Sequence, residues 1–237
     1  MKLNESIAVV TGVSSGLGKA LAKALIDEGA KVYGIARTVA ALNKLEEQLG
    51  DDFIAVPLDI TNQKGVEIWM DETFGGQTSP DILINNAGAG YFDKIDKLPD
   101  EKWHQMINTN LNGVFYLTRK IVPLMKQSSK GSYIVNIGSI LGAIGGAEKA
   151  AYCTTKFGIR GFSESLFKEL RYDDIKVTCF NPGSIETDFF AESGIEKHDN
   201  MLHPEDLAAT VIHILSTPDN MLISDLTIRP LNPKKHK

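Results

Sequence analysis

The sequence has few cysteines and no long apolar run. Only two cysteines, Cys153 and Cys179, occur in 237 residues, and no hydrophobic stretch approaches the ~20 residues of a membrane-spanning helix. Residues 1–6 show no apolar core followed by a small-residue cleavage site, so no secretory signal is predicted. These absences predict free thiols and a soluble protein of the cytoplasm with no membrane partner.

The sequence also lacks an excess of positive charge and any metal-binding pattern. The net charge is −5, and no basic cluster precedes the tail at residues 234–237, which disfavours nucleic-acid binding. The five histidines show no ligand spacing such as His-x-x-x-His, so no metal site is predicted. No internal repeat or charged linker marks a second domain, and residues 1–237 are predicted to form one domain.

Apolar runs of strand length alternate with longer amphipathic stretches, which is typical of βαβ units. Strands are predicted at residues 7–11, 31–36, 53–57, 81–85, 133–137, 176–181 and 225–229. Helices are predicted at residues 16–28, 39–49, 64–74, 101–126, 152–171 and 204–215. This order predicts an α/β fold, a Rossmann-type doubly wound parallel sheet of seven strands flanked by helices on both faces. Residues 182–203 lack clear periodicity, so a substrate lid is predicted near residues 184–203.

A tyrosine and a lysine four residues apart begin the helix that follows the fifth strand. Tyr152 and Lys156 share a helix face, so the phenol and the ammonium can reach the same atom. Ser139 lies 13 residues earlier, just after the strand. A neighbouring cation favours the phenolate and lowers a tyrosine pKa from ~10. Such a pair suits carbonyl reduction or alcohol oxidation.

Tyr116 with Lys120 and Tyr172 with Lys176 have the same spacing, so position must decide between the pairs. Open α/β sheets bind ligands beyond the carboxyl ends of their strands. Tyr152 follows a strand, whereas Tyr116 is predicted in the middle of a helix and Tyr172 at the opposite edge of the sheet. The latter two tyrosines are therefore interpreted as structural.

A glycine-rich turn joins the first strand to the first helix. Glycines allow a tight turn and close backbone approach, and the N–H groups at the start of the helix face an anionic phosphate. The turn therefore predicts a dinucleotide site formed by Gly12, Ser14, Ser15, Gly16, Leu17 and Gly18.

The second strand ends in Arg37 and Thr38, where an NAD-binding fold places an acid on the adenosine ribose. Because that acid is missing, Arg37 is predicted to bind the 2′-phosphate of NADP through charge-assisted hydrogen bonds. The alternative is an exposed surface arginine. The predicted cofactor is NADP(H), held in part by Arg37 and Thr38.

With these motifs, the chain resembles the short-chain dehydrogenase/reductase family over nearly its whole length. The matching segments are the glycine turn, Tyr152 to Lys156, Ser139, and residues 58–60, 85–88, 108–113 and 181–187. The resemblance implies that Tyr152 is the general acid or base, that Lys156 holds the nicotinamide ribose and lowers the pKa of Tyr152, and that Ser139 binds the substrate oxygen. It also implies that Asn110 holds a water in the proton relay.

The same resemblance implies further cofactor contacts. Asp59 and Ile60 are expected by the adenine, and Asn86, Ala87 and Gly88 near the ribose. The nicotinamide side is expected to involve Pro182, Gly183, Ile185 and Thr187, in addition to Tyr152 and Lys156. Asn85 is expected to tie strands together.

Two features depart from the family pattern. Ser15 stands where many NADP-using members carry a basic residue, so Arg37 must provide much of the phosphate recognition. The segment 225–231 lacks the glycine-rich C-terminal sequence common in the ketoacyl-reductase branch, which disfavours a fatty-acid synthesis enzyme.

The predicted function is an NADP-dependent oxidoreductase that transfers hydride between nicotinamide and a carbonyl or secondary alcohol of a small-molecule substrate. Candidate pocket residues indicate an apolar substrate but equally fit core or lid packing: Gly90, Tyr91, Leu141, Ile144, Phe189 and Phe190. The alternative is a catalytically silent NADP-sensing protein, which the complete set of Asn110, Ser139, Tyr152 and Lys156 disfavours.

The two longest predicted helices, 101–126 and 152–171, carry more apolar residues than one sheet face can cover. The excess predicts a homodimer or homotetramer in which these helices pack across a two-fold axis. The alternative is a monomer with a wide buried face.

Overall fold

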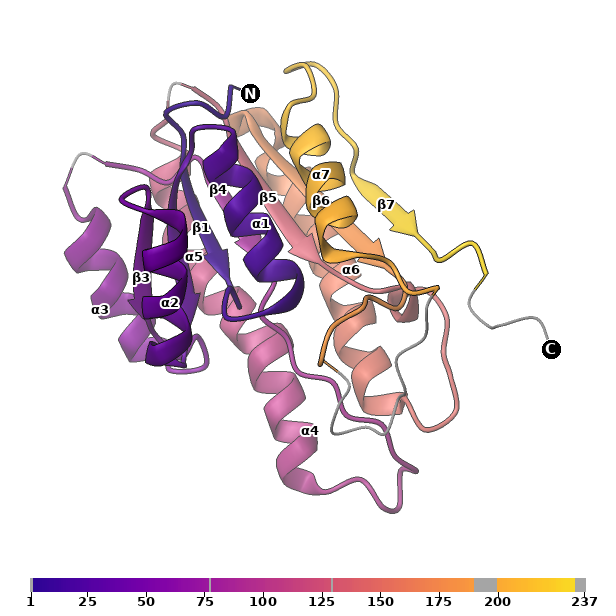
Figure 1. Cartoon of the computed structure of the whole chain (residues 1–237). Helices are drawn as coiled ribbons and strands as arrows, with labels where there is room; N and C mark the ends of the chain where they lie inside the picture. The colour runs from indigo at the N-terminus through magenta and orange to yellow at the C-terminus, as the bar shows by residue number, and fades with distance from the viewer. Residues whose placement is uncertain (1, 77, 129, 190–199, 233–237) are drawn as a thin grey trace.

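The predicted fold class is confirmed by a computed structural model that describes residues 2–76, 78–128, 130–189 and 200–232. Seven parallel strands form one sheet in the order β3-β2-β1-β4-β5-β6-β7, and helices cover both faces (Figure 1). The strands are β1 (Ile7–Thr11), β2 (Lys31–Ala36), β3 (Phe53–Pro57), β4 (Ile82–Asn85), β5 (Ser132–Ile137), β6 (Ile175–Pro182) and β7 (Asp225–Ile228).

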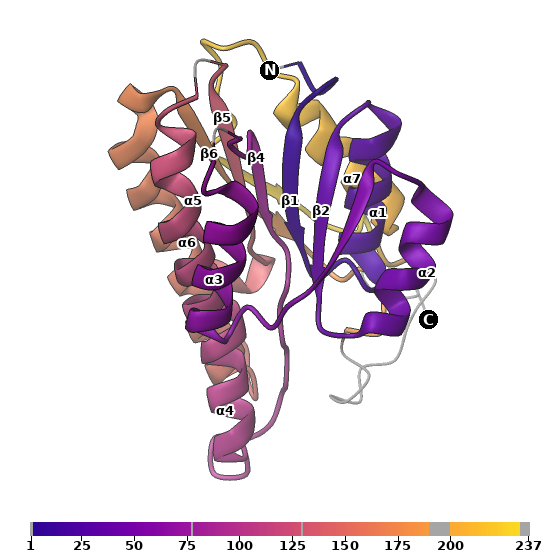
Figure 2. The same ribbon diagram turned by 90° about the vertical axis from the view of Figure 1, so that its left-hand side faces the viewer.

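Three helices pack on one face of the sheet and three on the other, as the turned view shows (Figure 2). One face is covered by α1 (Gly16–Asp27), α2 (Val39–Leu49) and α7 (Pro204–Leu215). The other is covered by α3 (Gln63–Phe74), α5 (Gly113–Met125) and α6 (Ala150–Leu170). The remaining helix, α4 (Asp100–Ile107), projects past the carboxyl ends of the strands (Figure 1).

The strands form here because their apolar side chains are buried on both faces. Successive side chains of a strand point to opposite faces, so Val10 packs beneath α1 and α7 while Val9 packs toward α3 and α5. All residues of β4 and β5 are buried, as expected of central parallel strands. By contrast, β7 alternates between exposed and half-buried positions because it is an edge strand.

The helix predicted at residues 101–126 is wrong as a single element. It consists of α4, a π turn at Asn108–Asn112 and α5, so the described residues contain seven α-helices rather than six. Both sides of the break have helical periodicity, and a π turn changes the backbone pairing without changing the residue pattern. Of the other predicted elements, β1, β2, β3, α2 and α7 have the predicted bounds, and the rest differ by one or two residues at an end.

No helix in the described part of the chain is long and apolar enough to cross a membrane. The two cysteines lie on α6 and β6, where both are buried free thiols, as predicted.

Candidate active site

The carboxyl ends of β1, β4, β5 and β6 bring most of the predicted segments to one edge of the sheet. The glycine turn follows β1, residues 86–88 follow β4, and Ser139 follows β5. The chain reverses its direction of winding between β1 and β4, because β2 and β3 lie on one side of β1 and the later strands on the other. Ligands of doubly wound sheets bind at such a switch point.

The glycine turn is packed too tightly for side chains. Gly12 has φ +72°, and a Cβ placed there would lie 2.8 Å from the Cα of Ala87. A Cβ on Gly18 would lie 2.1 Å from the Gly12 carbonyl oxygen. Gly16 lies beside Thr187, and Leu17 is buried, whereas Ser14 and Ser15 are exposed before the start of α1. This close approach provides the backbone cradle that a dinucleotide diphosphate requires.

Thr11, which the sequence analysis did not single out, fixes the turn to the segment after β4. Its Oγ1 accepts the backbone N–H groups of Asn86 (3.0 Å) and Ala87 (2.9 Å). The Asn86 amide in turn donates to the Thr11 carbonyl at 2.9 Å. No local pattern reveals such a role, because the partners lie about 75 residues apart.

Ser139 and Tyr152 lie together beyond the end of β5. Ser139 caps the turn Ile140–Gly142, where its Oγ accepts the N–H of Leu141 at 3.1 Å. Burial raises the pKa of Tyr152, and the neighbouring Ser139 side chain opposes this shift less strongly. Tyr152 is 4% exposed and lies in the first turn of α6, which begins at Ala150 rather than at Tyr152 as predicted.

Lys156 lies one helical turn after Tyr152 and points to the end of β5. Its Nζ donates to the Ile137 carbonyl at 2.9 Å and lies 5.7 Å from the centroid of the Tyr152 ring. Burial lowers the pKa of Lys156 to about 8. Burial penalises the Tyr152 phenolate as it penalises the Lys156 ammonium, so the pKa of Tyr152 is raised despite the neighbouring lysine.

Asn110 lies in the π turn and ties three segments together. Its Oδ1 accepts the Ala89 N–H at 2.7 Å, while its Nδ2 donates to the Ala89 carbonyl (2.8 Å) and to Thr155 Oγ1 (3.0 Å) on α6. These contacts use both N–H donors of the side-chain amide and one of the two lone pairs of its oxygen. The expected contact with a water stays a prediction. The Asn85 amide donates to Asn136 Oδ1 at 2.8 Å, which confirms that it ties β4 to β5.

The predicted adenine side lies at the ends of β2 and β3. Arg37 and Thr38 are exposed there, and Arg37 forms no ion pair with a described residue. Asp59 Oδ1 accepts the backbone N–H and the hydroxyl of Thr61 at 2.9 and 2.8 Å, which shapes the turn after β3. Ile60 is buried against Gly113 at the start of α5. These residues frame one rim of the switch point.

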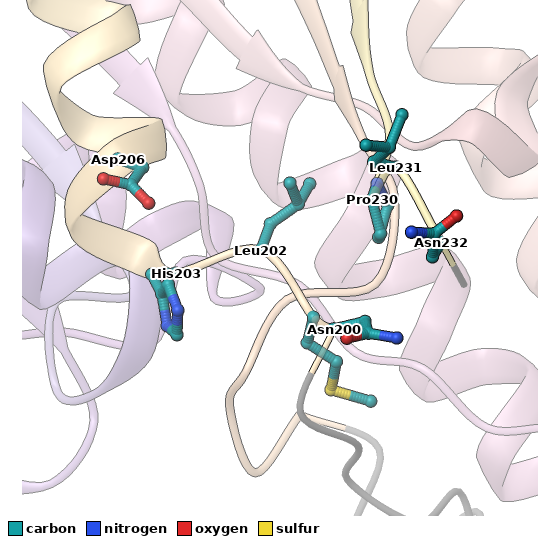
Figure 3. A pocket seen from close by; sticks show the side chains of 8 residues that line it. Asn200, Leu202, His203, Asp206, Pro230, Leu231 and Asn232 are labelled. Carbon is teal, nitrogen blue, oxygen red and sulfur yellow. The ribbon is translucent and has the colours of Figure 1, made fainter. Parts of the chain in front are cut away.

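The two described ends of the predicted lid are joined to each other. Ile185 and Leu202 form a β-bridge, and His203 Nδ1 lies 3.1 Å from Glu186 Oε2. Pro182 ends β6, and Gly183 packs on Pro230. A cavity of about 250 Å³ lies beside the joined ends of the lid (Figure 3). It is lined by Asn200, Met201, Leu202, His203, Asp206, Pro230, Leu231 and Asn232. Residues 190–199, including the candidate Phe190, lie outside the described residues.

Aromatic rings flank the Tyr152 ring. Phe92 and Phe189 pack edge-to-face on it, with centroids 5.4 and 6.2 Å away. Tyr91 and Leu141 pack in the same cluster, whereas Ile144 is 46% exposed. Phe92 was missed in the sequence, although the Tyr91-Phe92 doublet after Gly90 was a usable signal.

The other two tyrosine–lysine pairs lie away from this site. Tyr116 packs against the core beneath α5, and Lys120 pairs with Asp71 at 2.7 Å. Tyr172 is 84% exposed, and Lys176 Nζ donates to the Pro218 carbonyl at 2.6 Å. Neither pair adjoins Ser139, in agreement with their structural interpretation.

A doubly wound sheet with a glycine turn at its switch point and a buried Ser-Tyr-Lys set beside it defines a class, the dinucleotide-dependent oxidoreductases. The sequence model of the family described as short chain dehydrogenase matches residues 6–198. The chain therefore belongs to the short-chain dehydrogenase/reductase family and is an oxidoreductase of that type.

Similar proteins support this assignment. An uncharacterized oxidoreductase of Staphylococcus aureus (strain N315) is 35% identical over 233 residues, covering 97% of this chain and 99% of the relative. The closed form of a serine dehydrogenase complexed with NADP+ is 29% identical, with a TM-score of 0.88 and coverage of 98% and 99%. A 3-ketoacyl-(acyl-carrier-protein) reductase from Brucella melitensis complexed with NADH is 27% identical, with a TM-score of 0.86 and coverage of 97% and 98%.

Proposed function

We propose that this protein is an NADP(H)-dependent oxidoreductase acting on a carbonyl or secondary alcohol of a small, apolar substrate. The observation that carries the proposal is that the buried Ser139 and Tyr152 side chains lie together beyond β5, with Lys156 one helical turn after Tyr152. Two neighbouring hydroxyl donors suit an oxygen that gains negative charge during reduction.

The protein's part in the reaction follows from these positions. NADPH, when bound, supplies the hydride. Ser139 and Tyr152 donate hydrogen bonds to the substrate oxygen, and Tyr152 then transfers its proton to it. Burial disfavours the resulting phenolate, and the nearby ammonium of Lys156 offsets part of that cost. Asn110 holds the surrounding loop and connects it to α6 through Thr155.

The preference for NADP(H) is proposed from the end of β2. The glycine turn fits a diphosphate, and residues 86–88 and Thr187 lie beside it. Arg37 is exposed and forms no ion pair with a described residue, so its guanidinium is available to a 2′-phosphate. The solved relatives were found with NADP+ and with NADH, so the preference rests on Arg37.

The apolar substrate is proposed from the rings around Tyr152. Phe92 and Phe189 flank the phenol, and Tyr91 and Leu141 extend the same surface. Burial of a substrate chain or ring against them contributes about 25 cal/mol per Å² of apolar area.

A panel of aldehydes and ketones, assayed by the decrease in NADPH absorbance, tests the proposal. Turnover of apolar members, faster with NADPH than with NADH, is expected. NADPH binding without turnover of any member would favour the alternative, a catalytically silent NADP-sensing protein. Faster turnover of charged substrates would contradict the apolar assignment.

We further propose that the 237 residues form one domain and that the chain assembles as a homodimer or homotetramer. Phe115 on α5 and Phe157 on α6 are 45% and 47% exposed, which supports an interface formed by these helices. Light scattering tests the assembly, because a mass near 25.9 kDa that is stable on concentration would indicate a monomer. The cytoplasmic location stays a prediction, which cell fractionation tests.

A further inference from the structure

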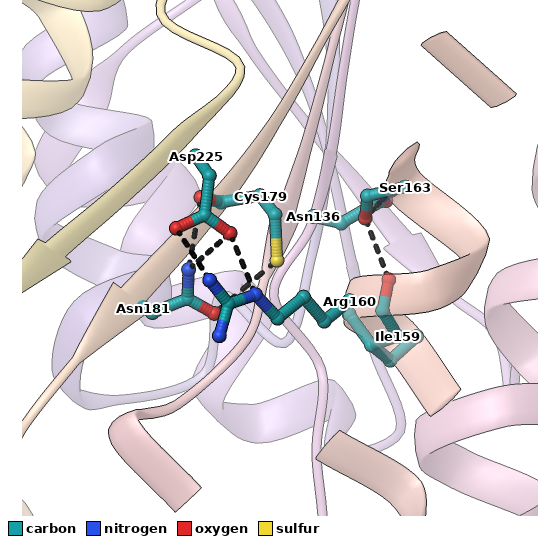
Figure 4. A network of polar contacts seen from close by, with 7 residues as sticks. All are labelled: Asn136, Ile159, Arg160, Ser163, Cys179, Asn181 and Asp225. Atoms are coloured by element: carbon teal, nitrogen blue, oxygen red, sulfur yellow. Dashed lines mark hydrogen bonds and ion pairs between the residues drawn. The ribbon is translucent and has the colours of Figure 1, made fainter. Parts of the chain in front are cut away.

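A chain of polar contacts runs from the buried Cys179 on β6 to the edge strand β7 (Figure 4). At its outer end, Arg160 on α6 pairs with Asp225, the first residue of β7. Arg160 Nε lies 3.1 Å from Asp225 Oδ2, and Arg160 Nη2 donates to Asp225 Oδ1 at 3.3 Å. Two parallel contacts of this kind fix orientation as well as distance. Arg160 lies one helical turn after Lys156, so the pair fixes that part of α6 to the sheet.

Asn181 connects this ion pair to the interior. Its Nδ2 donates to Asp225 Oδ2 at 3.2 Å, and its Oδ1 accepts the Cys179 thiol at 3.2 Å. Both Asn181 and Cys179 are 2% exposed on β6. The contacts therefore continue from a half-exposed ion pair to a buried thiol.

The inner end of the chain touches the backbone that holds Lys156. A Cβ on Gly138 would lie 2.1 Å from Asn181 Oδ1 and 3.1 Å from Cys179 Sγ. Asn181 therefore packs directly on the backbone between Ile137, whose carbonyl accepts the Lys156 hydrogen bond, and Ser139.

The charges around Lys156 are few. From β6 the Cys179 thiol faces it, and burial raises the pKa of that thiol. From its own helix Tyr152 faces it, β5 contributes the Ile137 carbonyl, and α4 packs nearby through the apolar Met106. Lys156 forms no ion pair with a described residue. The carboxylate in the chain of contacts is that of Asp225, which acts on Cys179 and pairs with Arg160.

We propose that Arg160 and Asp225 form a positioning pair that, through Asn181 and Cys179, holds the end of β5 around Lys156 and keeps the surrounding net charge near zero. The inference rests on the proposed function of Lys156. It assigns roles to four residues outside the Ser-Tyr-Lys set, with Asn181 as the link between the edge strand and the site.

Opposite single changes test this arrangement. Asp225→Asn leaves the Arg160 charge unopposed and is expected to lower the pKa of Lys156. Arg160→Gln leaves the Asp225 charge unopposed and is expected to raise it. Each shift is expected to be about half a pH unit at low salt, since both side chains are partly exposed and therefore screened. The double variant is expected to return close to the wild-type value.

The direct measurement is NMR titration of the lysine 13Cε signal, assigned by its loss in Lys156→Met. It needs neither substrate nor turnover, so an inactive wild-type protein would defeat the proposed function and leave this measurement interpretable. The pH dependence of NADPH oxidation is the second readout, in which the alkaline limit is expected to move with the same signs.

The matched control is an ion pair outside this network. Lys120 on α5 and Asp71 on α3 pair at 2.7 Å, so Lys120→Gln and Asp71→Asn are expected to leave the Lys156 titration unchanged. Shifts of the same sign in both test variants, or no shift in either, would overturn the proposal. If Arg160→Gln does not fold, the shape-preserving Asp225→Asn decides alone: a downward shift supports the proposal and an unchanged pKa overturns it.

Discussion

Lys156 Nζ donates a hydrogen bond to the carbonyl oxygen of Ile137 at 2.9 Å, two residues before Ser139 on the same strand end. The end of β5 therefore positions two members of the proposed catalytic set. It holds Lys156 through the backbone carbonyl of Ile137, and it carries Ser139 two residues later. Tyr152 completes the set from the first turn of α6.

Removing the phenolic hydroxyl tests the proton transfer. Tyr152→Phe keeps the ring between Phe92 and Phe189, so the fold and NADPH affinity are expected to stay near wild type. Turnover is expected to fall by at least ~10²-fold, as for other general acid–base groups. Steady-state kinetics with fluorescence titration of NADPH measures both, and unchanged turnover would rule out the proposed acid.

Removing the ammonium tests the dual role proposed for Lys156. Lys156→Met is expected to lower turnover and to weaken NADPH binding, because the ammonium stabilises the phenolate and is expected to contact the ribose. Lys120→Met, at the equivalent spacing after Tyr116, is the control and is expected to change neither. If Lys156→Met behaved like this control, the Tyr152–Lys156 pair would be structural.

Stability should depend on pH through the same lysine. Burial lowers its pKa from 10.5 to about 8, so the unfolded chain binds one more proton than the folded protein between these values. The free energy of unfolding is therefore expected to rise by about 2 kcal/mol from pH 8 to pH 10, relative to Lys156→Met. Burial raises the pKa values of Cys179 and Tyr152, which lowers stability at high pH and opposes the effect of Lys156. Both groups are present in the wild type and in Lys156→Met, so their effects cancel in the comparison. Urea unfolding at several pH values measures the difference, and parallel curves would contradict the prediction.

The cofactor preference is tested at the end of β2. Arg37→Ala is expected to weaken NADPH binding at least ~10-fold more than NADH binding, because a charge-assisted contact with the 2′-phosphate is lost. Adding Ala36→Asp is expected to shift preference toward NADH, since an acid here binds the ribose hydroxyl. Dissociation constants for both cofactors decide, and equal losses would mean that Arg37 supports the fold alone.

Close packing beneath the site is tested at Gly138. Gly138→Ala places a Cβ against Asn181 and is expected to reduce the free energy of unfolding by about 1–3 kcal/mol, with a loss of turnover. Gly145→Ala is the control, because nothing lies within 4 Å of its Cβ position. It is expected to change stability by no more than ~0.5 kcal/mol. Similar stability of the two variants would show that Asn181 moves freely.

The sheet could be predicted from the sequence because its strands are central and apolar. Runs such as those of β1 and β5 are buried on both faces, and their length separates them from the longer amphipathic helices. The π turn at Asn108–Asn112 could not be predicted, because the residues on both sides keep a helical period. Its consequence, the contact of Asn110 with Ala89 and Thr155, was equally hidden.

The site divides in the same way. The spacing of Tyr152 and Lys156 is local, so the sequence alone determined that they share one face of a helix. The glycines of the turn are also close in sequence, so the sequence alone determined the tight turn between β1 and α1. Only the tertiary structure decided the environment of these groups. Burial dominates the pKa of Tyr152 and Lys156, and the contacts through Asn181 join residues up to 44 positions apart. Such effects depend on which elements pack together, and no local pattern carries that information.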